Sequence, residues 1–282
     1  MAVFRIHKLL FIILFFPPAS SAQFIKKVLV DGKGVPIVML PGGTSDISAY
    51  APHAKELSAN YKVIRMEHLS VQFADEGKTL PVDYSVKIES EAIENTLDSL
   101  GVTEPIVLVG WSYGAVIALD FALNYPKRIR YLVLFEPPSF WIAKAKKESP
   151  EGMDKMIRLT SRFIPSVAIT EEDVKDFRCD LLNCDSIDIK KLPQWETWVK
   201  QKDRLRGLAA VSVYKNKIKR LNHFKRPVLI INGLTTVVFH KRINELLAAE
   251  FPNVVKKEIP GGHNAPVASS KEFIKTLTGL IK

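Results

Sequence analysis

The sequence is short of long apolar runs and of cysteine. Its one strongly apolar run lies within the first 22 of 282 residues, and only two cysteines occur. Because a helix that crosses a bilayer needs about 20 apolar residues, the chain beyond residue 22 is not expected to span a membrane. Neither Cys179 nor Cys184 has a histidine or third cysteine at the spacing of a zinc site, so we expect no metal and no cofactor.

Residues 1–22 differ in composition from the rest of the chain. Arg5 and Lys8 precede the apolar run LLFIILFF, and the segment PPASSA ends in small residues. This layout is typical of a secretory signal peptide that is cleaved after Ala22. We therefore expect an exported protein, secreted or periplasmic, with no transmembrane anchor after processing. In an oxidising compartment Cys179 and Cys184 are expected to form a local disulfide, with two reduced thiols as the alternative.

Short apolar runs alternate with helical patterns along the mature chain. Runs such as PIVLVG and PVLIIN suit strands that are buried on both faces. This alternation predicts a doubly wound, mostly parallel α/β sheet. It breaks once, between about residues 137 and 227, where only helical patterns occur. We predict an α/β core over residues 23–137 and 227–282, with a helical cap over residues 138–226.

The cap carries much of the chain's net charge of +10. Its segment from Arg204 to Arg226 holds eight basic residues and no acidic residue. Such a segment attracts anionic substrates or gives weak contact with anionic surfaces; alternatively it is a solvated helix face. No nucleic-acid-binding motif accompanies it, so no nucleic-acid partner is expected.

The segment PIVLVGWSYGAVIALDF carries the clearest chemical motif. Gly110 to Gly114 read G-x-S-x-G, and the motif joins a buried strand directly to a helix. In that context the small residues permit a sharp turn that exposes the Ser112 hydroxyl as a nucleophile. A serine needs a base, and His263 in IPGGHN follows a late strand. His68 is its only serious rival.

An attacked carbonyl becomes an oxyanion that needs hydrogen-bond donors. Gly43 in MLPGGTS follows a buried strand, where its backbone amide can approach a substrate. Tyr113, the residue after the nucleophile, supplies the second amide. We expect these two amides to form the oxyanion hole.

The order of these motifs resembles the α/β-hydrolase fold superfamily over residues 24–282. The resemblance implies a nucleophile–histidine–acid triad, but the usual aspartate after the strand 227–232 is missing, since Gly233 is followed by LTT. Glu136 ends the strand that follows the nucleophile helix, which the family's sheet order places beside the nucleophile strand. Certain haloalkane dehalogenases carry their acid there. We therefore predict Glu136 as the acid. The alternatives are Glu67, Asp185, or a broken triad in which Glu136 merely ends its strand and pairs with a lysine.

These residues predict an exported serine hydrolase that cleaves a carboxylic ester, a lactone or a related acyl compound. The same triad serves amide or carbon–carbon cleavage, and a non-catalytic binder with this fold is the alternative. The substrate is expected to be a small acyl compound, anionic or amphiphilic. Residues expected to contact it are Trp111, Trp141, Trp195 and Trp198.

Overall fold

The computed structural model describes residues 24–182, 184 and 188–281. The predicted signal peptide lies outside these residues. Within the described ranges, no helix is both long enough and apolar enough to cross a bilayer.

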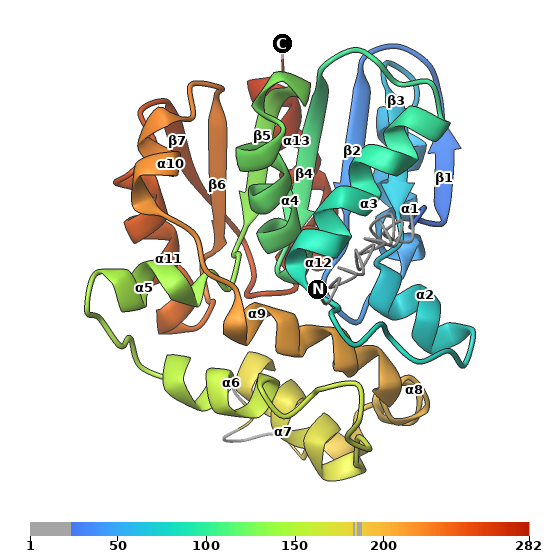
Figure 1. Cartoon of the computed structure of the whole chain (residues 1–282), viewed down its shortest axis with the longest axis vertical. Coiled ribbons are helices and arrows are strands. Elements are labelled where there is room, and N and C mark those ends of the chain that lie inside the picture. The colour runs from blue at the N-terminus through green and yellow to red at the C-terminus, as the bar shows by residue number, and fades with distance from the viewer. Residues whose placement is uncertain (1–23, 183, 185–187, 282) are drawn as a thin grey trace, which may run out of the picture.

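A seven-stranded sheet forms the centre of the described chain, in the order β1-β3-β2-β4-β5-β6-β7 (Figure 1). β1 pairs antiparallel with β3, and every other neighbouring pair is parallel. The predicted mostly parallel α/β sheet is therefore confirmed. The strands are β1 (Val28–Asp31), β2 (Pro36–Leu40), β3 (Lys62–Met66), β4 (Ile106–Trp111), β5 (Ile129–Phe135), β6 (Val228–Gly233) and β7 (Val254–Ile259).

Helices cover both faces of the sheet because its central strands are apolar on both sides. Every residue of β2 and β4 is buried. One face packs against α3 (Val86–Ser99), α4 (Tyr113–Asn124) and α11 (Val238–Ala248), and the other against α1 (Ala51–Leu57) and α13 (Ser270–Leu280). The short helices α2 (Leu69–Asp75) and α12 (Ala265–Ala268) follow β3 and β7.

Polar side chains cap the starts of two helical segments. Asp46 caps the turn before α1 by accepting from the Ser48 amide at 2.9 Å. Ser85 caps α3, because its hydroxyl accepts from the Ile88 amide. Gly101 follows α3 with a φ of +64°, the conformation that ends a helix.

A helical cap lies between β5 and β6, across the carboxyl ends of the strands (Figure 1). The predicted cap, which ended at residue 226, included the helix α10 (Ile218–His223). In the structure this helix lies beside the sheet (Figure 1). There Arg220 donates to the Leu123 carbonyl at 2.7 Å and Asn222 to the Glu250 carbonyl at 2.8 Å. The helices of this segment are α5 (Phe140–Ala145), α6 (Met153–Thr160), α7 (Glu171–Leu182), α8 (Trp195–Lys200), α9 (Ala209–Val213) and α10 (Ile218–His223).

The structure does not contain the predicted disulfide. Cys179 and Cys184 are free thiols, both partly buried. Cys179 lies in the last turns of α7, which extends to Leu182. Burial and the neighbouring Cys184 thiol raise the pKa of Cys179 to about 12.

Candidate active site

Ser112 occupies the sharp turn between β4 and α4. Its backbone has a φ of 55° and a ψ of −120°, outside the regions that L-residues prefer, and its amide donates to the Phe135 carbonyl at 2.8 Å. Such a conformation costs about 1–3 kcal/mol and persists only where the surroundings enforce it. Gly114 permits the close approach, because a Cβ there would lie 2.4 Å from the Pro41 carbonyl oxygen. The turn therefore has the strained geometry expected of a nucleophile elbow.

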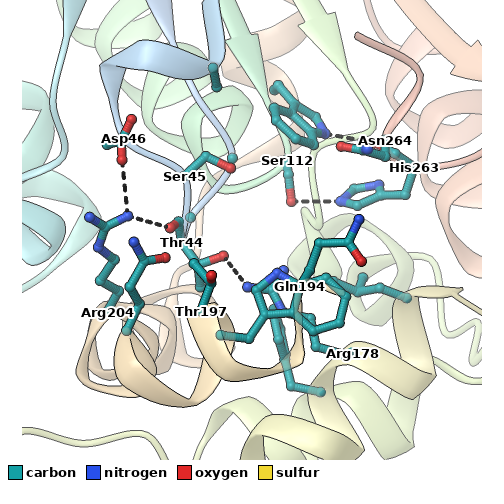
Figure 2. Close-up of a pocket in the computed structure, with 18 of the residues that line it drawn as sticks. Thr44, Ser45, Asp46, Ser112, Arg178, Gln194, Thr197, Arg204, His263 and Asn264 are labelled. Carbon is teal, nitrogen blue, oxygen red and sulfur yellow. Dashed lines mark hydrogen bonds and ion pairs between the residues drawn. The ribbon is translucent and has the colours of Figure 1, made fainter. Parts of the chain in front are cut away.

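His263 lies on the loop between β7 and α12, and its ring faces Ser112 (Figure 2). Its Nε2 is 2.9 Å from the Ser112 hydroxyl oxygen. The indole of Trp111 donates to the His263 carbonyl at 2.8 Å, which fixes the loop to the end of β4. Serine and imidazole thus lie within hydrogen-bond distance although 151 positions separate them.

Glu136 completes a line of three side chains. It follows β5 directly, is fully buried, and has a positive φ of 45°. Its Oε2 lies 2.6 Å from His263 Nδ1. Because Nε2 faces the serine hydroxyl, the neutral ring carries its proton on Nδ1 and donates it to the carboxylate.

The turn after β6, which lacks the usual aspartate, binds the Glu136 carboxylate instead. The Gly233 amide donates to Oε1 at 2.7 Å and the Thr236 hydroxyl donates to Oε2 at 2.8 Å. The carboxylate of Glu136 therefore lies across the end of β6, beside the position where an aspartate was expected. Sequence reasoning missed Thr236, and its place three residues after Gly233 was the available signal.

His240 is a second residue that the sequence analysis did not place here. Its ring is fully buried and stacks on His263, with the centroids 4.3 Å apart and the planes 10° from parallel. Burial, and then the His263 charge, lower the pKa of His240 well below its usual range, so the ring is neutral. Neither ring nitrogen has a hydrogen-bond partner among the described residues. Its contribution to the site is therefore packing against the His263 ring.

Glu136, His240 and His263 offer donor atoms that lie within 4.8 Å of one another, close enough to suggest a metal site. The two rings are nearly parallel, however, so their nitrogen lone pairs run side by side and do not converge on one point. A shared ion would require one ring to turn and would displace the Glu136–His263 hydrogen bond. The arrangement suits a hydrogen-bonded line better than metal coordination.

Gly43 and Tyr113 bring two backbone segments together beside Ser112. A Cβ on Gly43 would lie 3.0 Å from the Tyr113 Cβ and 2.4 Å from a Leu208 methyl group, so a larger residue would require the Leu208 side chain to move. Tyr113 opens α4, and the amides of a first helical turn have no acceptor within the helix. Both predicted oxyanion residues thus lie at the nucleophile.

The main pocket opens above Ser112 and His263 and has a volume of about 550 Å³. Its walls come from the loop after β2 and from the cap residues of α7 and α8 (Figure 2). A smaller, mainly apolar cavity of about 30 Å³ also borders Ser112 and is lined by Phe140, Phe239 and His240 among others. The main pocket therefore has a mixed polar and apolar lining, whereas the smaller cavity is mainly apolar.

Two of the four predicted substrate-contacting tryptophans line the main pocket, namely Trp111 and Trp198. Trp141 and Trp195 do not line this pocket. Trp141 is only 5% exposed and packs in the hydrophobic core beneath the cap. Trp195 packs partly against that core, and its ring lies 5.7 Å from the Lys190 amine.

His68 and Glu67, the described alternatives to His263 and Glu136, form hydrogen bonds to groups other than Ser112 and His263. His68 is buried, and its Nε2 lies 2.7 Å from the Pro41 carbonyl oxygen. Glu67 accepts from the Ile47 amide at 3.4 Å. Asp185 lies outside the described residues.

A family model described as the alpha/beta hydrolase fold matches residues 35–162. A cis-3-alkyl-4-alkyloxetan-2-one decarboxylase of Shewanella oneidensis is 31% identical over 41% of this chain and 36% of its own. A 2-hydroxy-6-oxo-6-phenylhexa-2,4-dienoate hydrolase of Comamonas testosteroni is 25% identical over 54% of this chain and 53% of its own. The chain thus spans about a third to a half of the length of these curated relatives.

Among solved structures, a thermophilic esterase from Thermogutta terrifontis superposes with a TM-score of 0.71. The match covers 91% of this chain and 92% of the esterase at 18% sequence identity, so it concerns the fold alone. Together with the observed sheet order, these likenesses show that the chain has the α/β-hydrolase fold.

Proposed function

We propose that this protein is an exported serine hydrolase that cleaves a carboxylic ester or lactone through an acyl-enzyme. The observation that carries the proposal is the line of hydrogen bonds from Ser112 through His263 to Glu136, at 2.9 and 2.6 Å. A hydroxyl, an imidazole and a carboxylate in this order have the geometry of nucleophilic catalysis. The proposal of export stands on the composition of residues 1–22 alone.

In the first step the Ser112 oxygen attacks the substrate carbonyl carbon while His263 Nε2 takes the hydroxyl proton. The imidazolium that forms is stabilised by the Glu136 carboxylate. The bonds from the Gly233 amide and the Thr236 hydroxyl hold that carboxylate beside the ring.

The attacked carbonyl oxygen becomes negatively charged, and the amides of Gly43 and Tyr113 are proposed to hold it. Loss of one such donor in an enzyme of this kind costs about 100- to 1,000-fold in kcat. The tetrahedral intermediate then collapses, the carbon–oxygen bond to the alcohol breaks, and His263 returns its proton to the departing oxygen.

Water completes the reaction. His263 takes a proton from the water as its oxygen attacks the acyl carbon, and the bond to Ser112 then breaks with that proton returned to the serine. The products are a carboxylic acid and an alcohol, or a hydroxy acid if the substrate is a lactone. The names of the similar proteins, an esterase and an oxetanone-processing enzyme, support this substrate class.

Turnover of 4-nitrophenyl esters with two to eight acyl carbons tests the proposal against a non-catalytic binder. The mature protein should hydrolyse at least one ester, and Ser112→Ala should lose activity by at least about 1,000-fold while its circular dichroism is unchanged. A parallel panel of anilides and of carbon–carbon hydrolase substrates measures the competing reactions. Ester hydrolysis that persists in Ser112→Ala, or an inert wild type, rejects the proposal.

A further inference from the structure

Two arginines line the main pocket, and their surroundings differ. The Arg204 guanidinium is neutralised, because Nε and Nη2 each lie 2.8 Å from an Asp75 carboxylate oxygen and Nη1 lies 3.3 Å from Asp46. Figure 2 shows the bond between Arg204 and Asp46. Arg204 therefore fastens the cap to the core and has little charge left to offer a substrate.

Arg178, on α7 of the cap, has no such neutralising group. Its Nη2 donates to the Thr44 hydroxyl at 2.9 Å, and its guanidinium carbon lies 4.6 Å from the centre of the Trp198 ring. No carboxylate among the described residues pairs with it, and its Nε is buried without an acceptor there. Burial lowers the pKa of Arg178 to about 10, which still leaves the group charged at neutral pH.

A charged guanidinium that is partly removed from water costs free energy unless an anion accompanies it. The bond to Thr44 and the contact with Trp198 do not explain why a charged residue stands here. A neutral hydrogen-bond donor would serve for the first contact and an apolar side chain for the second. These two contacts do hold the planar group in one orientation at the pocket wall. Arg178 is thus a fixed, partly desolvated cation with free donors, the arrangement that recognises carboxylates.

We propose that Arg178 binds a carboxylate of the substrate, and that the enzyme acts on esters or lactones that carry a free carboxylate beside the scissile bond. This inference rests on the proposed function, since Arg178 shares its pocket with Ser112 and His263. The small, mainly apolar cavity that also borders Ser112 suits a short apolar portion of the same molecule. Arg178 is assigned a role in specificity and takes no part in bond breaking.

Matched pairs of esters test the assignment. For a carboxylate on the acyl side, 4-nitrophenyl hydrogen glutarate is compared with 4-nitrophenyl pentanoate. For the leaving-group side, 4-carboxyphenyl butyrate is compared with phenyl butyrate. In at least one pair the wild type should have a higher kcat/KM for the anionic ester than for the neutral ester. The pair that shows this preference identifies whether the acyl side or the leaving-group side of the ester faces Arg178.

Arg178→Met keeps an unbranched side chain against Trp198 but removes the charge. It should lower kcat/KM for the preferred anionic ester by about 10- to 100-fold, mainly through KM, and change that of its neutral partner by less than about threefold. Arg178→Lys, which keeps the charge but lacks the planar fork, should lie between. Arg158→Met removes one exposed cap charge remote from the pocket and should leave the preference intact.

Glutarate binding, measured by calorimetry, tests the carboxylate site at Arg178 separately from the proposed hydrolase activity. Glutarate should bind the wild type and Ser112→Ala, and binding should weaken by at least about tenfold in Arg178→Met. If no ester is hydrolysed but this loss is seen, the proposed function fails and the carboxylate site stands. Arg178 is not the carboxylate-binding residue if Arg178→Met lowers kcat/KM equally for the anionic and the neutral ester. The same conclusion follows if Arg158→Met also abolishes the preference for the anionic ester.

Discussion

The Glu136 carboxylate lies 2.6 Å from His263 Nδ1, although 127 positions separate the two residues. β5 and β6 are parallel neighbours, so the residue after Phe135 emerges beside the turn that follows β6. From there the carboxylate is held by Gly233 and Thr236 at 2.7 and 2.8 Å. The usual acid position is thus filled from the adjacent strand, and the turn that lost its carboxylate still provides hydrogen-bond donors.

Returning an acid to that turn should partly replace Glu136. Glu136→Gln alone should lower kcat by about 1,000- to 10,000-fold, because a neutral amide neither selects the productive tautomer nor stabilises the imidazolium. The Thr236 hydroxyl lies 2.8 Å from Glu136 Oε2, so the double variant Glu136→Gln/Thr236→Asp places a carboxylate close to His263. We expect the double variant to recover at least about tenfold in kcat over Glu136→Gln.

The matched control for this rescue is Thr236→Asp in the wild-type background. It places two carboxylates side by side and should lower kcat, because like charges at this distance do not both remain ionised. If Thr236→Asp changed kcat in the same direction in the wild type and in Glu136→Gln, residues 136 and 236 would not share one function.

Much of the fold was predictable because the central strands are apolar along their whole length, with all six residues of β4 buried. The position of Glu136 was predicted from its place at the end of a strand and from the sheet order that the family resemblance implies. His240 and Thr236 were not predictable in this way, since their contacts depend on how the loops after two different strands pack. Trp141 shows the same limit, because an aromatic residue in a cap helix gives no sign of whether it faces the core or the pocket.

The His240 ring should matter to kcat through the orientation of His263. His240→Ala removes the stack at 4.3 Å and leaves space beside the imidazole, so kcat should fall by about 10- to 100-fold while KM and the pH profile of kcat/KM change little. His240→Phe keeps a ring in contact and should stay within about threefold of wild type. Equal activity of His240→Ala and wild type would show that the stack has no influence on the reaction.

Stability should decrease as the pH falls from 6.5 to 4, in part through His53. Burial, opposed by the bond between Nε2 and the Pro266 carbonyl, lowers the pKa of His53 to about 4. Between pH 6.5 and pH 4 the unfolded chain therefore binds a proton that the folded protein does not, and the stability present above pH 6.5 is lost. Glu67, whose pKa burial raises to about 7, acts in the opposite direction.

His53→Gln removes the His53 contribution and keeps a donor near Pro266. Urea unfolding at pH 7 and pH 5 should show a loss of stability that is smaller in the variant by about 1–2 kcal/mol. Since Glu67 is present in both proteins, its contribution cancels in the comparison. An identical loss in the two proteins would mean that His53 is protonated in the folded state.

Cys179 and Cys184 should remain free thiols in the purified protein. Alkylation with iodoacetamide in urea without a reductant should add two adducts by intact mass, and one adduct in Cys179→Ser. In the folded protein at pH 8 the reaction of Cys179 should be slow, because its raised pKa of about 12 leaves little thiolate. Alkylation that requires prior reduction would instead establish the disulfide.

The central claim is that Glu136 and His263 activate Ser112, and the rate of its phosphonylation tests this most directly. A fluorophosphonate should add once to the wild type, at Ser112 by peptide mass spectrometry, and should not add to Ser112→Ala. Glu136→Gln should react at least about 100-fold more slowly, because its histidine no longer accepts the serine proton efficiently. Labelling of Glu136→Gln at the wild-type rate, or labelling of Ser112→Ala, would contradict the account.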